Sequence, residues 1–151
     1  MRVLLTVILA ALPLCAELRT LEMNLGGLDC DSCALSVDRV VKRIRGVDTA
    51  TFDAKTNVLS VTFKPDNKVQ LSAIRDAVKG VGYTPGEVRL TAVGSLTQDN
   101  GAWQFQLSGQ ATKWKADVAE SLRKRAGNDV LVDGTLKEEI LTIKSLETAA
   151  K

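Results

Sequence analysis

The chain has 151 residues, enough for two small hydrophobic cores or one of medium size. Its 20 basic and 18 acidic side chains leave a net charge of +2, which excludes the strongly basic surface that holds nucleic acid without sequence preference. Histidine is absent, so mechanisms that need an imidazole as general base or metal ligand are excluded too. We therefore expect no nucleic-acid partner and no enzyme activity.

Residues 1–16 have the basic start, short apolar centre and small-residue exit of a secretory signal peptide. The apolar run from Val3 to Leu14 is short for a bilayer span, so we expect no membrane span in the mature chain. Cleavage after Ala16 would leave a periplasmic or secreted protein. A lipid anchor on Cys15 is a minority alternative, because Leu14 is larger than the residue that usually precedes a lipidated cysteine.

Two periodicities predict a β-α-β-β-α-β order for residues 17–92. Alternating apolar and polar residues predict strands, and apolar residues at helical spacing predict two helices that end at Gly46 and Gly80. The segment Pro65-Asp66-Asn67 is expected to supply a break and the N-cap of the second helix. This order packs both helices on one face of a four-stranded antiparallel sheet, the ferredoxin-like arrangement. The apolar positions are Leu21, Met23 and Leu25, Val37, Val40, Val41 and Ile44, Leu59, Val61 and Phe63, Leu71, Ile74 and Val78, and Val88, Leu90 and Ala92.

Residues 93–151 are rich in strand patterns and turn signals. One helix is predicted among them, with Trp114, Val118 and Leu122 on a single stripe. We predict a small, mainly-β unit with one helix, an OB-like barrel, which makes the whole chain α+β. No flexible linker interrupts the chain near residue 92, so we expect the two units to pack against each other.

After removal of the leader, Cys30 and Cys33 are the remaining cysteines. One lies in the loop before the first predicted helix and the other in its first turn, so the helix dipole and unpaired backbone N–H groups favour the thiolate form of both. Two thiolates separated by two residues can face one soft ion, such as Cu(I), Hg(II), Zn(II) or Cd(II). The sequence therefore predicts a soft-metal site in this loop.

The ligand count indicates what this site is for. A structural zinc site uses four protein ligands, whereas the mature chain offers two cysteines and no histidine. Two thiolates satisfy a linear or trigonal ion, but zinc would need a carboxylate such as Asp29 or Asp31, water, or a second molecule. An undercoordinated ion can pass to a partner, so we expect carriage or scavenging in place of permanent structural binding.

The segment from Gly27 to Cys33, followed by a helix, a hairpin, a second helix and Gly82-Tyr83, resembles the heavy-metal-associated domain. That family includes copper chaperones, mercury-scavenging periplasmic proteins and the N-terminal modules of metal-exporting P-type ATPases. The resemblance covers about residues 18–92. It implies that Cys30 and Cys33 bind one soft metal ion, Cu(I) or Zn(II), Cd(II) or Hg(II), and that a metal-transporting ATPase or another metal-receiving protein is a partner.

Three positions near the motif qualify the resemblance. The family usually has methionine where this chain has Leu28, and leucine has a similar volume. Asp29 is similar to the variant in zinc, cadmium and lead exporters, where the aspartate can join as a ligand; it is equally well explained as a helix-capping residue. Tyr83 matches a loop position that tunes the bound metal in the family, or it simply packs over the core.

Two other functions remain open from the residues alone. In an oxidising compartment the cysteine pair can form a disulfide or act as a thiol-disulfide redox protein, although the aromatic residue usual before a thioredoxin-type motif is absent. The chain can also be an adaptor whose C-terminal unit binds a partner. Trp103 and Phe105 alternate with glutamine, which favours a strand that fills a core over a base-stacking surface. Basic residues from Lys113 to Arg125 are expected to be solvated.

Overall fold

The computed structural model describes residues 17–27 and 31–149, with side chains for residues 18–27 and 37–149. The predicted leader, with Cys15, lies outside the described residues. No helix within these ranges combines the length and apolar character that crossing a bilayer requires. The elements are β1 (Glu17–Gly26), α1 (Asp31–Lys42), β2 (Val47–Asp53), β3 (Val58–Phe63), α2 (Leu71–Gly80), β4 (Thr84–Asp99), β5 (Ala102–Leu107), β6 (Lys113–Val118), α3 (Glu120–Arg123), β7 (Val130–Lys137) and β8 (Ile140–Thr148).

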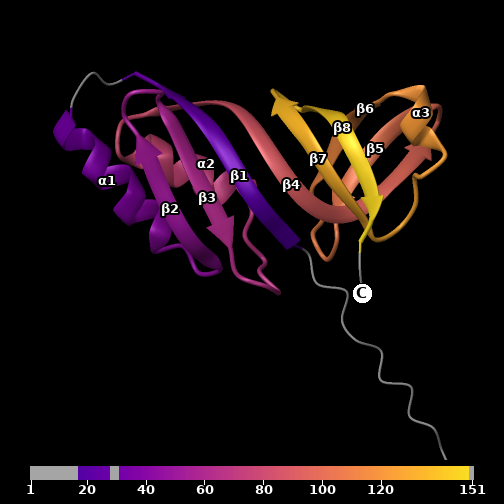
Figure 1. Ribbon diagram of the computed structural model, residues 1–151, viewed down its shortest axis with the longest axis horizontal. Helices are drawn as coiled ribbons and strands as arrows, with labels where there is room; N and C mark the ends of the chain where they lie inside the picture. Colours follow the sequence, from indigo (N-terminus) through magenta and orange to yellow (C-terminus); the bar gives the residue numbers. More distant parts are fainter. Residues whose placement is uncertain (1–16, 28–30, 150–151) are drawn as a thin grey trace, which may run out of the picture.

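The first six elements form an N-terminal unit with the predicted β-α-β-β-α-β order (Figure 1). Strand β1 is antiparallel to β3 on one side and to β4 on the other, and β2 pairs with β3, which gives the order β2-β3-β1-β4. α1 contacts β2, α2 contacts β4, and the helices contact each other. The predicted ferredoxin-like topology is therefore confirmed for this unit.

Burial follows the predicted periodicities closely. The alternating positions of β1 and β3 and the inner stripe of α2 are buried in one cluster with Val37 and Val41 of α1. α2 ends at Gly80, as predicted. α1 ends earlier, at Lys42, and Gly46 makes the following turn with a φ of 105°. A side chain is strained at this φ, so glycine serves the turn and not the helix terminus.

The prediction that the segment Pro65-Asp66-Asn67 supplies the N-cap of α2 is wrong. The N-cap residue is Gln70, whose side chain makes no capping hydrogen bond. Asn67 is instead buried, and its Nδ2 donates to the carbonyl oxygens of Leu18 at 2.8 Å and Lys64 at 2.9 Å. The amide satisfies one carbonyl at the start of β1 and one directly after β3, a role set by tertiary contacts that a local capping pattern does not reveal.

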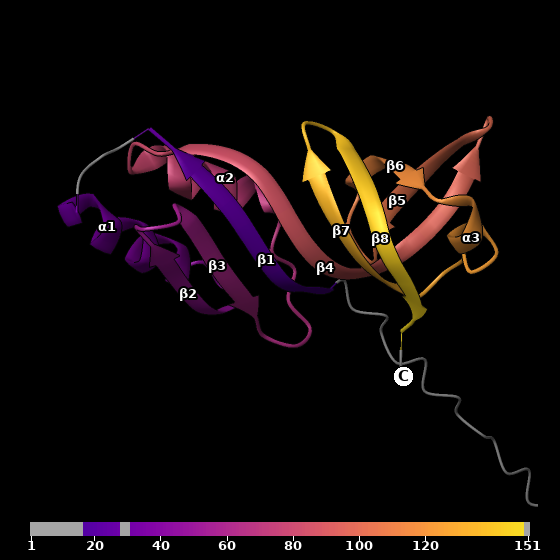
Figure 2. The ribbon, with the colours of Figure 1, turned by 45° about the horizontal axis from the view of Figure 1, so that its top comes forward.

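β4 joins the N-terminal unit to a C-terminal unit of strands β4 to β8 and helix α3, as Figure 2 shows. Val88–Val93 pair with β1 on one side and β7 on the other. From β4 the pairing continues through β5, β6 and β8 to β7, which returns to β4 and closes a ring of five strands. The division at residue 92 thus falls inside β4, and both units share this strand.

The helix predicted on the stripe of Trp114, Val118 and Leu122 is wrong for most of its length. Lys113–Val118 form strand β6, and α3 covers Glu120–Arg123 alone. Trp114 and Val118 are four positions apart, a spacing that one face of a strand and one face of a helix share. The pairing of β6 with β5 and β8 decides the outcome in favour of the strand.

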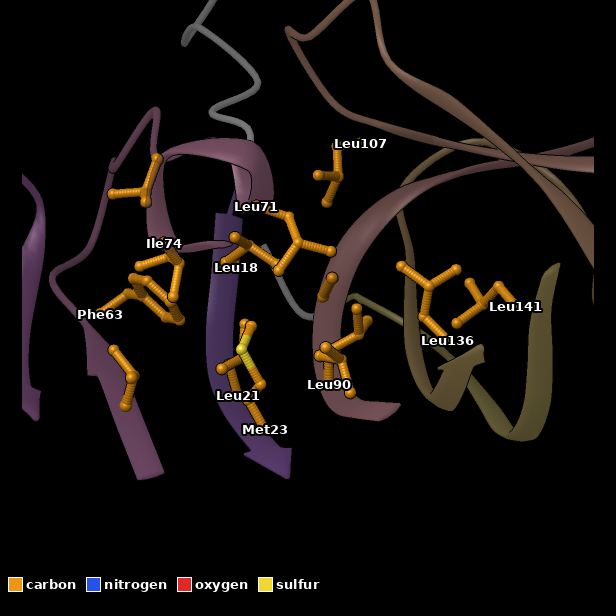
Figure 3. Close-up of a cluster of buried hydrophobic side chains, with 14 of the residues drawn as sticks. Leu18, Leu21, Met23, Phe63, Leu71, Ile74, Leu90, Leu107, Leu136 and Leu141 are labelled. Atoms are coloured by element: carbon orange, nitrogen blue, oxygen red, sulfur yellow. The ribbon is translucent and has the colours of Figure 1, made fainter. Parts of the chain in front are cut away.

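The two units share one hydrophobic core, which was the expected consequence of the missing linker. Figure 3 shows Leu18, Leu21 and Ile74 on one side of β4, and Leu136 and Leu141 on the other. The buried cluster continues through β4, so separating the units would expose apolar surface to water. The free-energy cost of that exposure is about 25 cal/mol for each Å².

Gly94 lies in β4 where its pairing passes from β7 to β5. A Cβ atom at this position would meet the carbonyl oxygen of Gln106 and lie 2.6 Å from Cζ of Phe105. The missing side chain therefore lets the buried Phe105 ring pack directly against the β4 backbone.

Asp38 connects α1 to β2, because the backbone N–H of Phe52 donates a hydrogen bond to its carboxylate. The Oδ1 atom of Asp38 is buried and has no hydrogen-bond partner among the described residues. Burial raises the pKa of Asp38 above its ordinary value of 3.8, and the Phe52 hydrogen bond offsets part of this shift.

We predict that Gly94→Ala lowers the free energy of unfolding by about 1–3 kcal/mol, the usual cost of overpacking a core. Gly127→Ala is the matched control, since a Cβ atom there meets nothing within 4 Å. Urea unfolding followed by tryptophan fluorescence measures both. Equal midpoints for the two variants would show that the close approach at Gly94 carries no energetic weight.

We predict that Asp38→Asn stabilises the protein more at about pH 7 than at about pH 3. Because the folded-state pKa of Asp38 is raised, its contribution to stability is fully present below the unfolded-state pKa and is lost as pH rises through the folded-state pKa. Asparagine stays neutral and escapes this loss. Thermal unfolding at both pH values tests it, with Asp76→Asn on α2 as control for the removed charge. A benefit confined to acid would contradict the prediction.

Candidate metal site

The predicted metal loop connects the end of β1 to the start of α1. Cys33 is the third residue of α1, so its backbone lies in the first helical turn. Asp29 and Cys30, like Leu28, lie outside the described residues, and so does the side chain of Cys33. The structure thus fixes the two elements that carry the motif, while the approach of the two sulfur atoms to one ion stays a prediction.

The base of this loop rests on the connection between α2 and β4. Gly26 pairs with Thr84, and a Cβ atom on Gly27 would lie 3.4 Å from Oγ1 of Thr84 and 3.9 Å from the carbonyl oxygen of Gly82. Gly27 has a φ of 105°, which glycine adopts without strain. The loop therefore starts from a fixed and closely packed point.

Thr84 is a contact of the loop that the sequence analysis missed. The sequence indicated a turn around Tyr83, but it carried no signal that Gly26 and Thr84 are opposite each other. Only the register between β1 and β4 brings Thr84 to the loop. Long-range strand register is set by tertiary packing and has no local pattern.

Tyr83 is buried, with 4% of its surface exposed. Its ring centroid lies 5.3 Å from that of Phe52 on β2, and the rings are tilted by 59°. Such a tilted pair contributes about 0.5–1.5 kcal/mol beyond area burial. Of the two predicted roles, the packing of Tyr83 over the core is the one the described residues display.

The charge pattern of α1 suits an anionic group at its start. Arg39 and Lys42 occupy its last turn, where positive charge interacts favourably with the C-terminal end of the helix dipole. The opposite end, which carries Cys33, is the positive end of the dipole. Thiolates would be stabilised there, with the unpaired N–H groups of the first turn as donors.

Outside the motif, the described part of the chain contains no cluster of three or more cysteine and acidic residues that could hold a metal ion. Asp53, at the β2–β3 turn, accepts a hydrogen bond at 2.9 Å from the backbone N–H of Lys55, which lowers the pKa of its carboxyl group. This carboxylate stabilises a turn and belongs to no group of ligands.

The aromatic residues of the C-terminal unit fill its core. Phe105 is fully buried and stacks on Trp114 with ring centroids 6.3 Å apart, while Trp103 is half-buried. This confirms the core role over a base-stacking surface for Phe105. Lys113, Lys115, Arg123, Lys124 and Arg125 are exposed, as expected of a solvated face.

Comparisons with a family model and with known proteins indicate the same family. The heavy-metal-associated domain matches residues 22–84. The zinc-transporting ATPase of Synechocystis sp. is 34% identical over 72 residues, which cover 48% of this chain and 10% of the ATPase. The copper chaperone CopZ of Staphylococcus aureus is 31% identical over 61 residues, which cover 40% of this chain and 88% of the chaperone.

A solved structure of a CopZ metallochaperone is 29% identical, with a TM-score of 0.41, and the match covers 44% of this chain and 97% of the metallochaperone. The chain spans about a tenth of the length of the zinc-transporting ATPase but nearly all of the copper chaperone. The matched region contains the second half of β1, the predicted metal loop, both long helices and the first residue of β4. Through residues 22–84, the chain belongs to the heavy-metal-associated domain family.

Proposed function

We propose that the protein binds one soft metal ion between the thiolates of Cys30 and Cys33 and carries or scavenges it. The observation that supports this most directly is the family match over residues 22–84, which includes both cysteines at the junction of β1 and α1. Metal binding is the shared property of this family, and neither catalysis nor a resident cofactor is needed to explain the motif.

Two physical arguments favour carriage over permanent binding. The first turn of α1 offers positive dipole and N–H donors, which favour thiolate and hence soft ions. Two thiolates leave coordination positions that a partner's ligands can occupy, so an ion can pass through a shared intermediate. Transfer to a metal-transporting ATPase or another metal-receiving protein is the partner class that we propose.

The ion is proposed to be Cu(I) or a divalent soft ion, Zn(II), Cd(II) or Hg(II). The relatives are named for both metals, a zinc-transporting ATPase and a copper chaperone. Asp29 is the residue of this chain that would favour the divalent ions, since a carboxylate is a hard ligand that Zn(II) accepts more readily than Cu(I).

We also propose that residues 1–16 direct export to the periplasm or cell exterior, on the strength of their basic start and short apolar run. The C-terminal unit is proposed to be an OB-like barrel. Its support is the ring of five strands, in which β6 and β8 are parallel and α3 lies between β6 and β7 along the chain.

We predict that Cys30→Ser and Cys33→Ser each weaken metal binding by about 10²- to 10⁴-fold, because one thiolate loses the chelate advantage of two. Competition titration of reduced protein with Cu(I), Zn(II) and Hg(II) under nitrogen measures stoichiometry and affinity. Ser60→Ala, at an exposed position of β3 away from the motif, is the control and should retain one ion per chain with unchanged affinity.

The same titration separates metal carriage from a redox function. If reduced wild-type protein takes up none of these ions at micromolar concentration, the proposal fails. Catalysed reduction of disulfide substrates by such metal-free protein would then identify a thiol-disulfide redox protein. Metal uptake that survives in both cysteine variants would place the site elsewhere in the chain.

We predict that Asp29→Ala weakens Zn(II) more than Cu(I), by about tenfold against less than about twofold, because only the divalent ion gains from the carboxylate. Asp48→Ala on β2 is the control for loss of one negative charge. Equal effects on the two ions would remove Asp29 from the ligand set and leave it the capping role.

A further inference from the structure

A recess of about 390 Å³ lies where the two units meet. Its lining includes Arg75 and Lys79 from α2, Glu87 from β4, Lys137 from the end of β7, and Glu138 from the β7–β8 turn. Pro85 and Gly86 complete the lining. Neither unit alone supplies this set, so the recess exists only because the C-terminal unit is fixed beside α2.

The charged groups around the recess are unused within the described structure. Arg75, Lys79 and Lys137 form no ion pair or hydrogen bond to another described side chain, and neither do Glu87 and Glu138. Three cations against two carboxylates leave the recess one charge positive. Arg75 and Lys79 are one helical turn apart, so they present their charge on the same face of α2.

An apolar anchor stands beside these charges. Ile140 is the one large hydrophobic residue that is exposed among the described side chains, with 49% of its surface accessible. It pairs with Lys137 across the β7–β8 turn, and residues directly opposite on antiparallel strands place their side chains on the same face. Ile140 therefore adds an exposed apolar side chain next to Lys137, one of the charged residues that line the recess.

The position of this surface relates it to the metal loop. Pro85 follows Thr84, which packs against the base of that loop at Gly27. Figures 1 and 2 both place the β7–β8 turn on the same side of the molecule as the end of β1. Pairing of β4 with β7 holds the turn there rigidly, so a partner that reaches the metal loop from this side meets the turn.

We propose that the recess and the β7–β8 turn dock an acidic segment of the metal-exchange partner, one that carries an apolar residue next to its carboxylates. The carboxylates bind Arg75, Lys79 and Lys137, and the apolar residue covers Ile140. This proposal rests on the proposed function for the identity of the partner, but its docking chemistry is independent of metal binding. The C-terminal unit thereby becomes part of partner selection.

The test uses the full chain and a fluorescent synthetic peptide in which glutamate alternates with leucine. Fluorescence anisotropy should detect binding that weakens with added salt, and the combined variant Arg75→Gln, Lys79→Gln, Lys137→Gln should weaken it about tenfold or more. Ile140→Ser should weaken it as well. The matched control, Lys113→Gln, Lys115→Gln, Lys124→Gln, removes the same charge from the far part of the C-terminal unit and should bind within about twofold of wild type.

Metal titration of the same variants keeps the two proposals apart, because the docking variants should bind Cu(I) and Zn(II) like wild type. The docking proposal is overturned if a lysine-leucine peptide binds as well as the glutamate-leucine peptide, if both triple variants lose binding equally, or if wild type shows no binding at millimolar peptide. Self-association in sedimentation that Ile140→Ser abolishes would assign the surface to a second copy of the chain and overturn it too.

Discussion

The structure depends on the hydrogen bonding of one strand, β4, along both of its edges. Over Val88–Val93 it pairs with β1 of the N-terminal unit and with β7 of the C-terminal unit. Backbone groups in a sheet interior are shielded from water, so leaving one of these edges unpaired would carry the cost of unsatisfied donors and acceptors. The two units are therefore held by the same ladder that stabilises each of them, and their relative placement is as firm as the sheet.

This ladder also bears on the metal loop. Thr84, the first residue of β4, packs against Gly27 where the loop begins, and Tyr83 just before it is anchored on Phe52. Because β4 is paired along its length, the position of Thr84 is fixed, and so is the point where the loop begins. The loop thus leaves from Gly27, which packs against Thr84, and ends at the first turn of α1, so both of its ends are held by elements of the fold.

Much of the N-terminal unit was predictable because its signals are local. Leu21 and Met23 alternate with polar residues, as a strand requires, and Ile74 and Val78 have helical spacing. The cysteine motif lies at the start of a predicted helix. Three features were not predictable. Trp114 and Val118 share a spacing that fits helix and strand, Asn67 serves a backbone carbonyl of distant β1, and the contact between Gly26 and Thr84 depends on register. In each case contacts with residues far along the chain determine the structure, and no local sequence pattern indicates those contacts.

The return of β7 to β4 has a consequence for colloidal behaviour. In the order β2-β3-β1-β4 alone, β4 would be an outer strand with free N–H and C=O groups, as β2 is. With β7 in place, β2 is the one described strand whose outer edge is open along its whole length. A filament built by edge-to-edge strand pairing needs two open strand edges on each copy. A molecule with one such open edge can form a pair through β2 but offers no second edge from which a filament could grow.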